Sequence, residues 1–190
     1  MTIKQDYNDK FRLSLQDGII DKNLPIKGAL ELTYRCNLRC VHCYTQENTK
    51  NKEMSFEQID NLLNEIRSAG CLWLLISGGE PLLRQDFIKI YHKIKAYGFL
   101  PVIFTNATLI SEKIAKVFSE YRPLAIEVSL YALGEKQYKK ITKVTGAFKK
   151  CMEGIGLLKK YKIPFRIKMP LMSLNKDELG KVKNYAEKLS

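Results

Sequence analysis

The sequence of 190 residues lacks any hydrophobic run long enough to cross a membrane, and its first ten residues contain no apolar segment of the kind that directs secretion. The longest apolar run covers residues 72–76 and has the length of a β-strand. A membrane-spanning helix needs about 18 consecutive apolar residues. We therefore expect a cytoplasmic protein without membrane contact.

The sequence has fewer acidic than basic residues. It contains 20 Asp and Glu and 32 Lys and Arg, which give a formal net charge of +12. Most of the excess lies in residues 134–190, which hold 15 basic and 5 acidic side chains. This pattern fits either lysine-rich, solvated helix faces or attraction to an acidic partner. Aromatic residues are not interleaved with the basic ones as base stacking requires, so nucleic acid is not an expected partner.

Low complexity and internal repeats are also absent, which excludes a fibrous or largely disordered chain. Hydrophobic residues make up 45% of the sequence and charged residues 27%, as in ordinary globular proteins. A chain of this length suits one domain without a disulfide framework. We expect an N-terminal arm over residues 1–26 and a single core domain over residues 27–190.

Strand-like and helix-like patterns alternate along that core domain. Strands are predicted over residues 29–33, 72–76, 100–104, 124–130 and 163–169. A helix is predicted over residues 56–68 because Ile59, Leu63 and Ile66 follow a helical period and Ser55 and Gln58 form a capping box. Each later strand is also followed by a helical pattern, and the last helix, over residues 175–189, is expected to be capped by Asn175 and Glu178.

Such alternation predicts an α/β fold with parallel strands and outer helices. Five βα units could form either an open doubly wound sheet or a partial (β/α) barrel. In both architectures, function gathers at the carboxyl ends of the strands. The polar and cysteine-rich motifs of this sequence follow four predicted strands, so they are expected to meet at one rim.

The first of these motifs contains three of the five cysteines, Cys36, Cys40 and Cys43, in a C-x3-C-x2-C pattern. Thiolates at this density bind soft metals, so the spacing alone is compatible with an iron–sulfur cluster, with zinc or with unpaired structural thiols. Cys71 and Cys151 are isolated in the sequence and are expected to be buried core thiols.

Three further motifs follow in order: Gly-Gly-Glu-Pro at 78–81, Thr-Asn-Ala-Thr at 105–108 and Glu-Val-Ser-Leu-Tyr at 127–131. Together with the cysteine motif they resemble the successive motifs of the radical S-adenosylmethionine (SAM) superfamily, over roughly residues 27–190. The resemblance implies that Cys36, Cys40 and Cys43 hold three irons of a [4Fe–4S] cluster and that SAM chelates the fourth. One electron from the cluster would then cleave SAM to a 5′-deoxyadenosyl radical, which would abstract a hydrogen atom from a substrate.

The resemblance also implies a set of SAM contacts, each with a structural alternative. Residues of this predicted cofactor site are His42, Gly78, Gly79, Glu80, Pro81, Thr105, Asn106 and Ser129. His42 would pack on adenine, Glu80 would accept a hydrogen bond from the SAM ammonium, and Asn106 would contact the nucleoside. Alternatively, Gly78 and Gly79 make only a tight turn, Glu80 acts as a first-turn carboxylate, and Asn106 is an ordinary turn residue.

Details of the motifs are similar to the branch of the superfamily that carries cysteine-rich C-terminal extensions and mostly modifies ribosomally made peptides. Some members act on haem-like or quinone cofactors, and a homologue without substrate turnover is a further alternative. The resemblance also implies an electron donor such as a flavodoxin or a ferredoxin. Because the family barrel has six βα units and five are counted here, we expect a truncated core with an open sheet edge that self-associates or needs a complementing chain.

Overall fold

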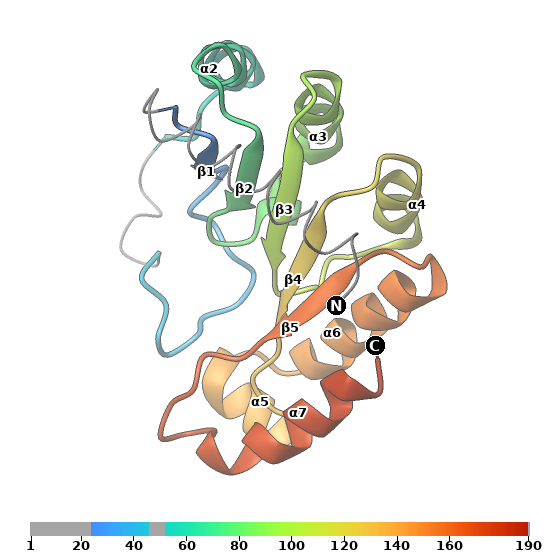
Figure 1. Cartoon of the computed structure of the whole chain (residues 1–190). Helices are drawn as coiled ribbons and strands as arrows, with labels where there is room; N and C mark the ends of the chain where they lie inside the picture. The colour runs from blue at the N-terminus through green and yellow to red at the C-terminus, as the bar shows by residue number, and fades with distance from the viewer. Residues whose placement is uncertain (1–23, 46–51, 190) are drawn as a thin grey trace.

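The strands of the computed structural model, which describes residues 24–45 and 52–189, form one parallel sheet (Figure 1). They are β1 (Lys27–Glu31), β2 (Trp73–Ser77), β3 (Leu100–Thr105), β4 (Ala125–Ser129) and β5 (Phe165–Lys168). Their order in the sheet is β1-β2-β3-β4-β5. A doubly wound sheet would reverse its order partway, whereas a barrel adds strands in sequence. The predicted α/β fold with a partial barrel of five parallel strands is therefore confirmed.

Helices connect the strands and cover one face of the sheet (Figure 1). They are α2 (Phe56–Ser68), α3 (Phe87–Ala96), α4 (Glu112–Glu120), α5 (Glu135–Thr142), α6 (Ala147–Lys160) and α7 (Leu179–Glu187), with short 3-10 turns η2 (Pro81–Leu83) and η3 (Lys176–Glu178). The predicted capping box of α2 is present: Gln58 N donates to Ser55 Oγ at 3.2 Å, and Ser55 N donates to Gln58 Oε1 at 2.8 Å. Within the residues that the structure describes, no helix is both long enough and apolar enough to span a membrane.

The sequence analysis missed one helix and was wrong about the cap of another. α5 was not predicted, because its eight residues are lysine-rich and offer few apolar positions at helical spacing. Asn175 does not cap the last helix, which begins only at Leu179 after η3. The Asn175 side chain instead accepts from Met172 N and donates to the carbonyls of Pro170 and Tyr131. These contacts fix the loop after β5, so tertiary hydrogen bonds replace the local cap.

The two faces of the sheet differ in character because side chains alternate along each strand. Ile76, Ile103 and Ile126 point toward the helices and are completely buried. On the other face, Ser77, Phe104 and Ser129 line a pocket. Cys71 and Cys151 are buried, as expected for core thiols. Most of the predicted arm over residues 1–26 lies outside the described residues.

Candidate functional site

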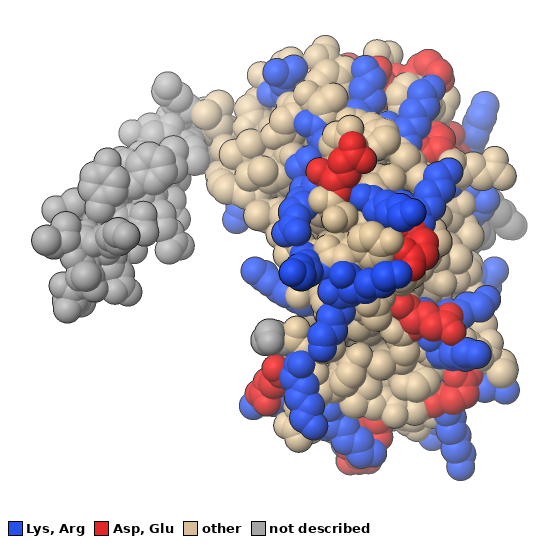
Figure 2. Space-filling model, turned by 90° about the vertical axis from the view of Figure 1, so that its right-hand side faces the viewer, with Lys and Arg blue, Asp and Glu red and all other residues tan. Residues whose placement is uncertain are grey.

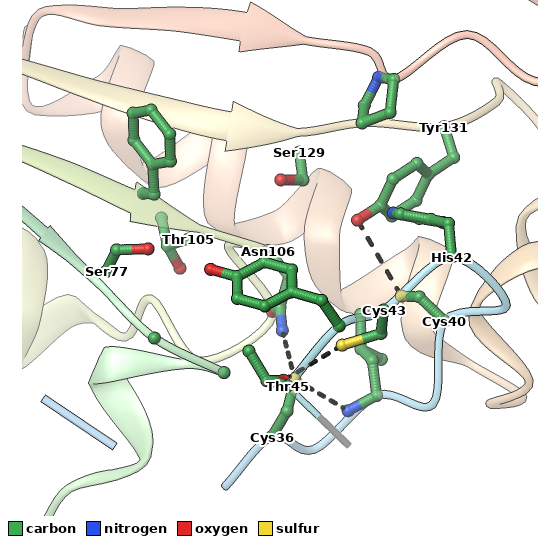
Figure 3. Close-up of a pocket in the computed structure, with 16 residues that line it drawn as sticks. Cys36, Cys40, His42, Cys43, Thr45, Ser77, Thr105, Asn106, Ser129 and Tyr131 are labelled. Atoms are coloured by element: carbon green, nitrogen blue, oxygen red, sulfur yellow. Dashed lines mark hydrogen bonds between the residues drawn. The ribbon is translucent and has the colours of Figure 1, made fainter. Parts of the chain in front are cut away.

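Residues that follow or end all five strands line one pocket of about 240 Å³ at the carboxyl edge of the sheet (Figure 3). Nine of the residues singled out from the sequence lie in its wall: Cys36, Cys40, His42, Cys43, Gly78, Gly79, Thr105, Asn106 and Ser129. The side chains of Glu80 and Pro81 do not line it, because both residues are buried behind the turn that carries them. The topology thus brings together segments that are separated by up to about 90 residues of sequence.

The three thiols face different partners. Cys36 Sγ accepts from Leu38 N at 3.4 Å, Cys40 Sγ lies 3.9 Å from the Tyr131 hydroxyl, and Cys43 Sγ lies 3.1 Å from Thr45 Oγ1. Consequently, among the described residues no group of three or more Cys, His, Asp or Glu is arranged around a point where a metal ion could sit. The donor set nevertheless suits a soft metal or an iron–sulfur cluster, because three thiols of one short loop all line the same pocket.

Burial affects the protonation of two of these thiols, Cys36 and Cys40. It raises the pKa of Cys40 to about 11 and also raises the pKa of Cys36. Both groups are therefore protonated at neutral pH in the free chain. Because metals bind the thiolate, loading this loop with metal would release protons.

The Gly78-Gly79 turn packs directly on the backbone that leads into the cysteine loop. A Cβ atom on Gly78, whose φ is +129°, would lie 2.2 Å from Thr33 O, and one on Gly79 would lie 2.3 Å from Arg35 O. Two hydrogen bonds join the same segments: Gly79 N donates to Thr33 O at 2.7 Å and Glu80 N donates to Arg35 O at 2.9 Å. The glycines are thus required for close approach of the chain to itself, in addition to any role beside a cofactor.

Glu80 connects the turn after β2 to the end of β3. Its carboxylate is fully buried and accepts hydrogen bonds from Thr105 Oγ1 at 2.8 Å, Asn106 N at 2.8 Å and Leu82 N at 3.1 Å. Burial raises the pKa of Glu80 to about 7, and the three donors offset part of that rise. Pro81 follows as the first residue of η2, where its missing N–H costs nothing.

Asn106 joins the turn after β3 to the cysteine loop. Its Nδ2 donates to Asn37 Oδ1 at 3.0 Å, while Asn37 Nδ2 donates to Thr108 Oγ1 at 2.7 Å. The ring of bonds closes at Thr108 Oγ1, which donates to Asn106 Oδ1 at 2.6 Å. These contacts hold two motifs 70 residues apart against each other, so Asn106 is more than an isolated turn residue.

Two features of the site were not predicted. Tyr131 lies in the pocket wall, with its hydroxyl near Cys40 and its ring 5.1 Å from the His42 ring in an edge-on contact (Figure 3). Its place two residues after Ser129, on the same side of the chain, is a signal that could have found it. The second feature is α5, which supports the cysteine loop through hydrogen bonds that no local pattern reveals.

The sequence and the fold are similar to those of known proteins. The model of the Radical SAM superfamily matches residues 30–186. The chain belongs to the radical SAM superfamily. The AdoMet-dependent heme synthase of Methanosarcina barkeri is 30% identical over 169 residues, which are 88% of this chain and 48% of that protein. The probable GTP 3′,8-cyclase of Thermococcus kodakarensis is 32% identical over 162 residues, 84% and 52% of the two chains.

Among solved structures, native anSMEcpe with bound AdoMet and Kp18Cys peptide is similar, with a TM-score of 0.73 and 22% identity. The alignment covers 85% of this chain and 48% of that one, and it supports the partial barrel fold. Members of the radical SAM superfamily are enzymes that bind a [4Fe–4S] cluster and SAM. This radical SAM chain spans about half the length of the curated relatives it matches.

Proposed function

We propose that Cys36, Cys40 and Cys43 hold three irons of a [4Fe–4S] cluster and that SAM occupies the pocket beside them. The observation that carries this proposal is the pocket itself, which the three thiols share with Gly78, Gly79 and other residues expected to contact SAM. When bound, the cluster and SAM supply a one-electron cleavage that gives methionine and a 5′-deoxyadenosyl radical able to abstract a hydrogen atom.

Within that pocket, the chain's own residues bind and orient the cofactor. We propose that the His42 ring, which contacts Tyr131 edge-on, packs against the adenine, because it lines the pocket beside the three thiols and is exposed. The Ser129 hydroxyl and the Asn106 side chain would contact the nucleoside from the ends of β4 and β3. The backbone of Gly78 and Gly79 would approach the methionine part, since both glycines line the pocket and carry no side chain.

A contact between Glu80 and the SAM ammonium, as the family resemblance implies, stays a prediction. The carboxylate has three donors already and is fully buried, so the turn would have to move before an ammonium could reach it. A role that needs no such movement is to fix the Gly-Gly turn to the end of β3. Both roles can be separated by measuring SAM affinity and stability in the same variant.

The cluster assignment is tested by anaerobic reconstitution and metal analysis. The chain should carry about four irons and four sulfides, as expected for a cubane cluster. Replacing Cys36, Cys40 or Cys43 with alanine should abolish this content, whereas Cys71→Ala and Cys151→Ala serve as matched controls and should retain it. Loss of the cluster in Cys151→Ala together with its retention in Cys43→Ala would overturn the assignment.

Formation of 5′-deoxyadenosine then tests catalysis. With dithionite as the reductant, the reconstituted chain should convert SAM to 5′-deoxyadenosine and methionine, at a slow and uncoupled rate when no substrate is present. A loaded cluster with no product would favour the alternative of a binding homologue without turnover.

A ribosomally made peptide is the substrate class that we propose from the sequence motifs. A tetrapyrrole is the second candidate, and the similarity to the heme synthase of Methanosarcina barkeri is the observation that favours it. Adding an iron porphyrin or a candidate precursor peptide to the assay distinguishes them, because the true substrate class should accelerate formation of 5′-deoxyadenosine and be modified itself.

A further inference from the structure

The outer side of the cysteine loop rests on the last turn of α5. Arg39 N donates to Thr142 O at 2.9 Å, and Val41 N donates to Ile141 O at 3.0 Å. These two bonds flank Cys40 on both sides in sequence. They satisfy carbonyls at the end of α5 that have no partner within the helix. Residues 39–41 and the end of α5 therefore lie side by side. In Figure 1, α5 lies beyond the carboxyl end of β4.

The exposed residues of these two segments include four cations. We define the α5 basic surface as Arg39, Val41, Lys139, Lys140 and Lys143, all of which are exposed. The acidic residue of α5, Glu135, lies at the opposite end of the helix, where its carboxylate accepts from Gly146 N at 2.6 Å. No ion pair between described residues involves the four cations. Their charge is therefore directed to solvent.

Two details distinguish these cations from ordinary solvated lysines. Arg39 is held in place, because its Nη1 donates to Cys36 O at 2.7 Å and to Leu38 O at 3.0 Å. Lys143 has a left-handed backbone with φ of 60°, where glycine or asparagine is usually found. Val41, which lies between Arg39 and the end of α5 in this set, exposes 46% of its area. An exposed apolar residue together with several unpaired cations is typical of a surface that recognises an acidic protein.

The α5 basic surface is also close to Cys40 along the chain. Cys40 is 8% exposed, and its exposed chain neighbours Arg39 and Val41 both belong to this surface. Electron transfer between proteins weakens steeply with distance, so a donor should contact the exterior where a buried redox centre is covered by the thinnest layer. If the proposed cluster is held by the cysteine loop, the α5 basic surface includes the two chain neighbours of one cluster ligand, Cys40.

From these observations we propose that the α5 basic surface is the docking site for an acidic one-electron carrier protein of the flavodoxin type. This proposal rests on the proposed function. In the docked pair, one electron passes from the reduced flavin to the cluster, so the carrier is oxidised by one electron and the cluster is reduced by one. Opposite charges on the two partners would speed their association and make it sensitive to salt.

Basic side chains also occur over the helix-covered face of the molecule, where they outnumber acidic ones (Figure 2). A matched control is therefore needed to separate local docking from overall charge. Lys113 and Lys116 on α4 are exposed, and reversing both changes the net charge by the same amount as reversing Lys139 and Lys140. The test compares Lys139→Glu/Lys140→Glu with Lys113→Glu/Lys116→Glu.

Binding is measured first on the chain without a cluster, by calorimetric titration with an acidic flavodoxin at low and high salt. We expect the α5 reversal to weaken the Kd about tenfold and to reduce its salt dependence, while the α4 reversal leaves the Kd nearly unchanged. Equal weakening by both reversals, or by neither, would overturn the docking site. If Lys139→Glu/Lys140→Glu fails to fold, the neutral variant Lys139→Gln/Lys140→Gln replaces it in the same titration. This variant should also weaken binding.

Turnover of the reconstituted chain then separates this inference from the proposed function. With dithionite, all variants should form 5′-deoxyadenosine at the wild-type rate, because a small reductant needs no docking surface. With reduced flavodoxin, only the α5 reversal should be slow. Failure of the wild-type chain with dithionite would refute the proposed function, whereas a wild-type rate of the α5 reversal with flavodoxin would refute the docking site alone.

Discussion

Gly154 on α6 offers a sharp test of how the site is positioned. A Cβ atom at this position would lie 2.1 Å from Ala107 O and 3.1 Å from Ala107 C, inside the turn that carries Asn106. Ala107 itself has a φ of 60°, and its carbonyl accepts from Ile110 N at 3.2 Å. The backbone of the turn thus contacts α6 directly at Gly154, where no side chain separates the two. Gly154→Ala should push the turn away from the helix by about 1 Å, the shift that restores an ordinary van der Waals contact.

The expected change in the free energy of unfolding is the balance of destabilising and stabilising contributions. Overpacking a rigid contact costs about 1–3 kcal/mol, and loss of the Ile110–Ala107 hydrogen bond adds about 1 kcal/mol. Replacing glycine by alanine inside a helix returns about 0.5–1 kcal/mol. Gly154→Ala should therefore lower the free energy of unfolding by about 1–3 kcal/mol, which corresponds to a fall in Tm of several degrees in a chain of this size.

Gly156→Ala is the matched control, because it makes the same change on the same helix two residues later. Its Cβ would meet no atom within 4 Å, so only the helical gain remains and Tm should rise slightly. Thermal unfolding followed by circular dichroism measures both variants, and SAM affinity of the reconstituted protein reports whether Asn106 has moved. Equal Tm values for Gly154→Ala and Gly156→Ala would show that the turn does not rest on α6.

Further predictions concern the turns and the sheet edge. Folding raises the pKa of Glu80 from 4.5 to about 7, so the folded chain favours the neutral carboxyl group. The contribution of this group to the free energy of unfolding is therefore complete below pH 4.5 and should be lost as the pH rises toward 7. The loss is about 3 kcal/mol in total, and it should appear in chemical denaturation as a pH-dependent difference between the wild type and Glu80→Gln. Glu80→Ala should weaken SAM binding by about 1.5–3 kcal/mol if Glu80 contacts the ammonium, and unchanged affinity with an intact cluster would leave it only the positioning role. Gly79→Ala should reduce the iron content after reconstitution, since its Cβ would displace Arg35 beside Cys36; a full complement of iron would contradict this. β5 pairs only with β4 among the described strands, so the isolated chain is expected to self-associate, and a monomer on a sizing column at high concentration would refute that expectation.

Much of this architecture is encoded locally and was predicted from the sequence. The helix over 56–68 is specified by its own apolar spacing and by the Ser55–Gln58 capping box, both of which act within a few residues. All five strands were found because buried parallel strands form short apolar runs between turn signals. By contrast, α5 escaped prediction, since its stability depends on Tyr138 and Ile141 being buried by distant parts of the chain.

The chemistry of the candidate site was also visible in the sequence. Cysteine spacing indicated soft-metal binding, and the order of the strand-end motifs indicated that they would share one rim. These inferences succeed because βα alternation forces the carboxyl ends of parallel strands to one edge of the sheet. The sequence alone therefore indicated nine of the residues that line the pocket, although it also included Glu80 and Pro81, which do not line it, and did not single out others such as Tyr131.

Only the tertiary structure decided how those residues are held. The Gly-Gly turn needs its glycines because Thr33 and Arg35 pack on it, and Glu80 is buried between two strand ends rather than open to the pocket. The cysteine loop is supported by α5, about 100 residues later in the chain. Such contacts depend on the distances between segments that are remote in sequence, and these distances are fixed only once the parallel sheet has formed. Residue type and spacing do not contain them.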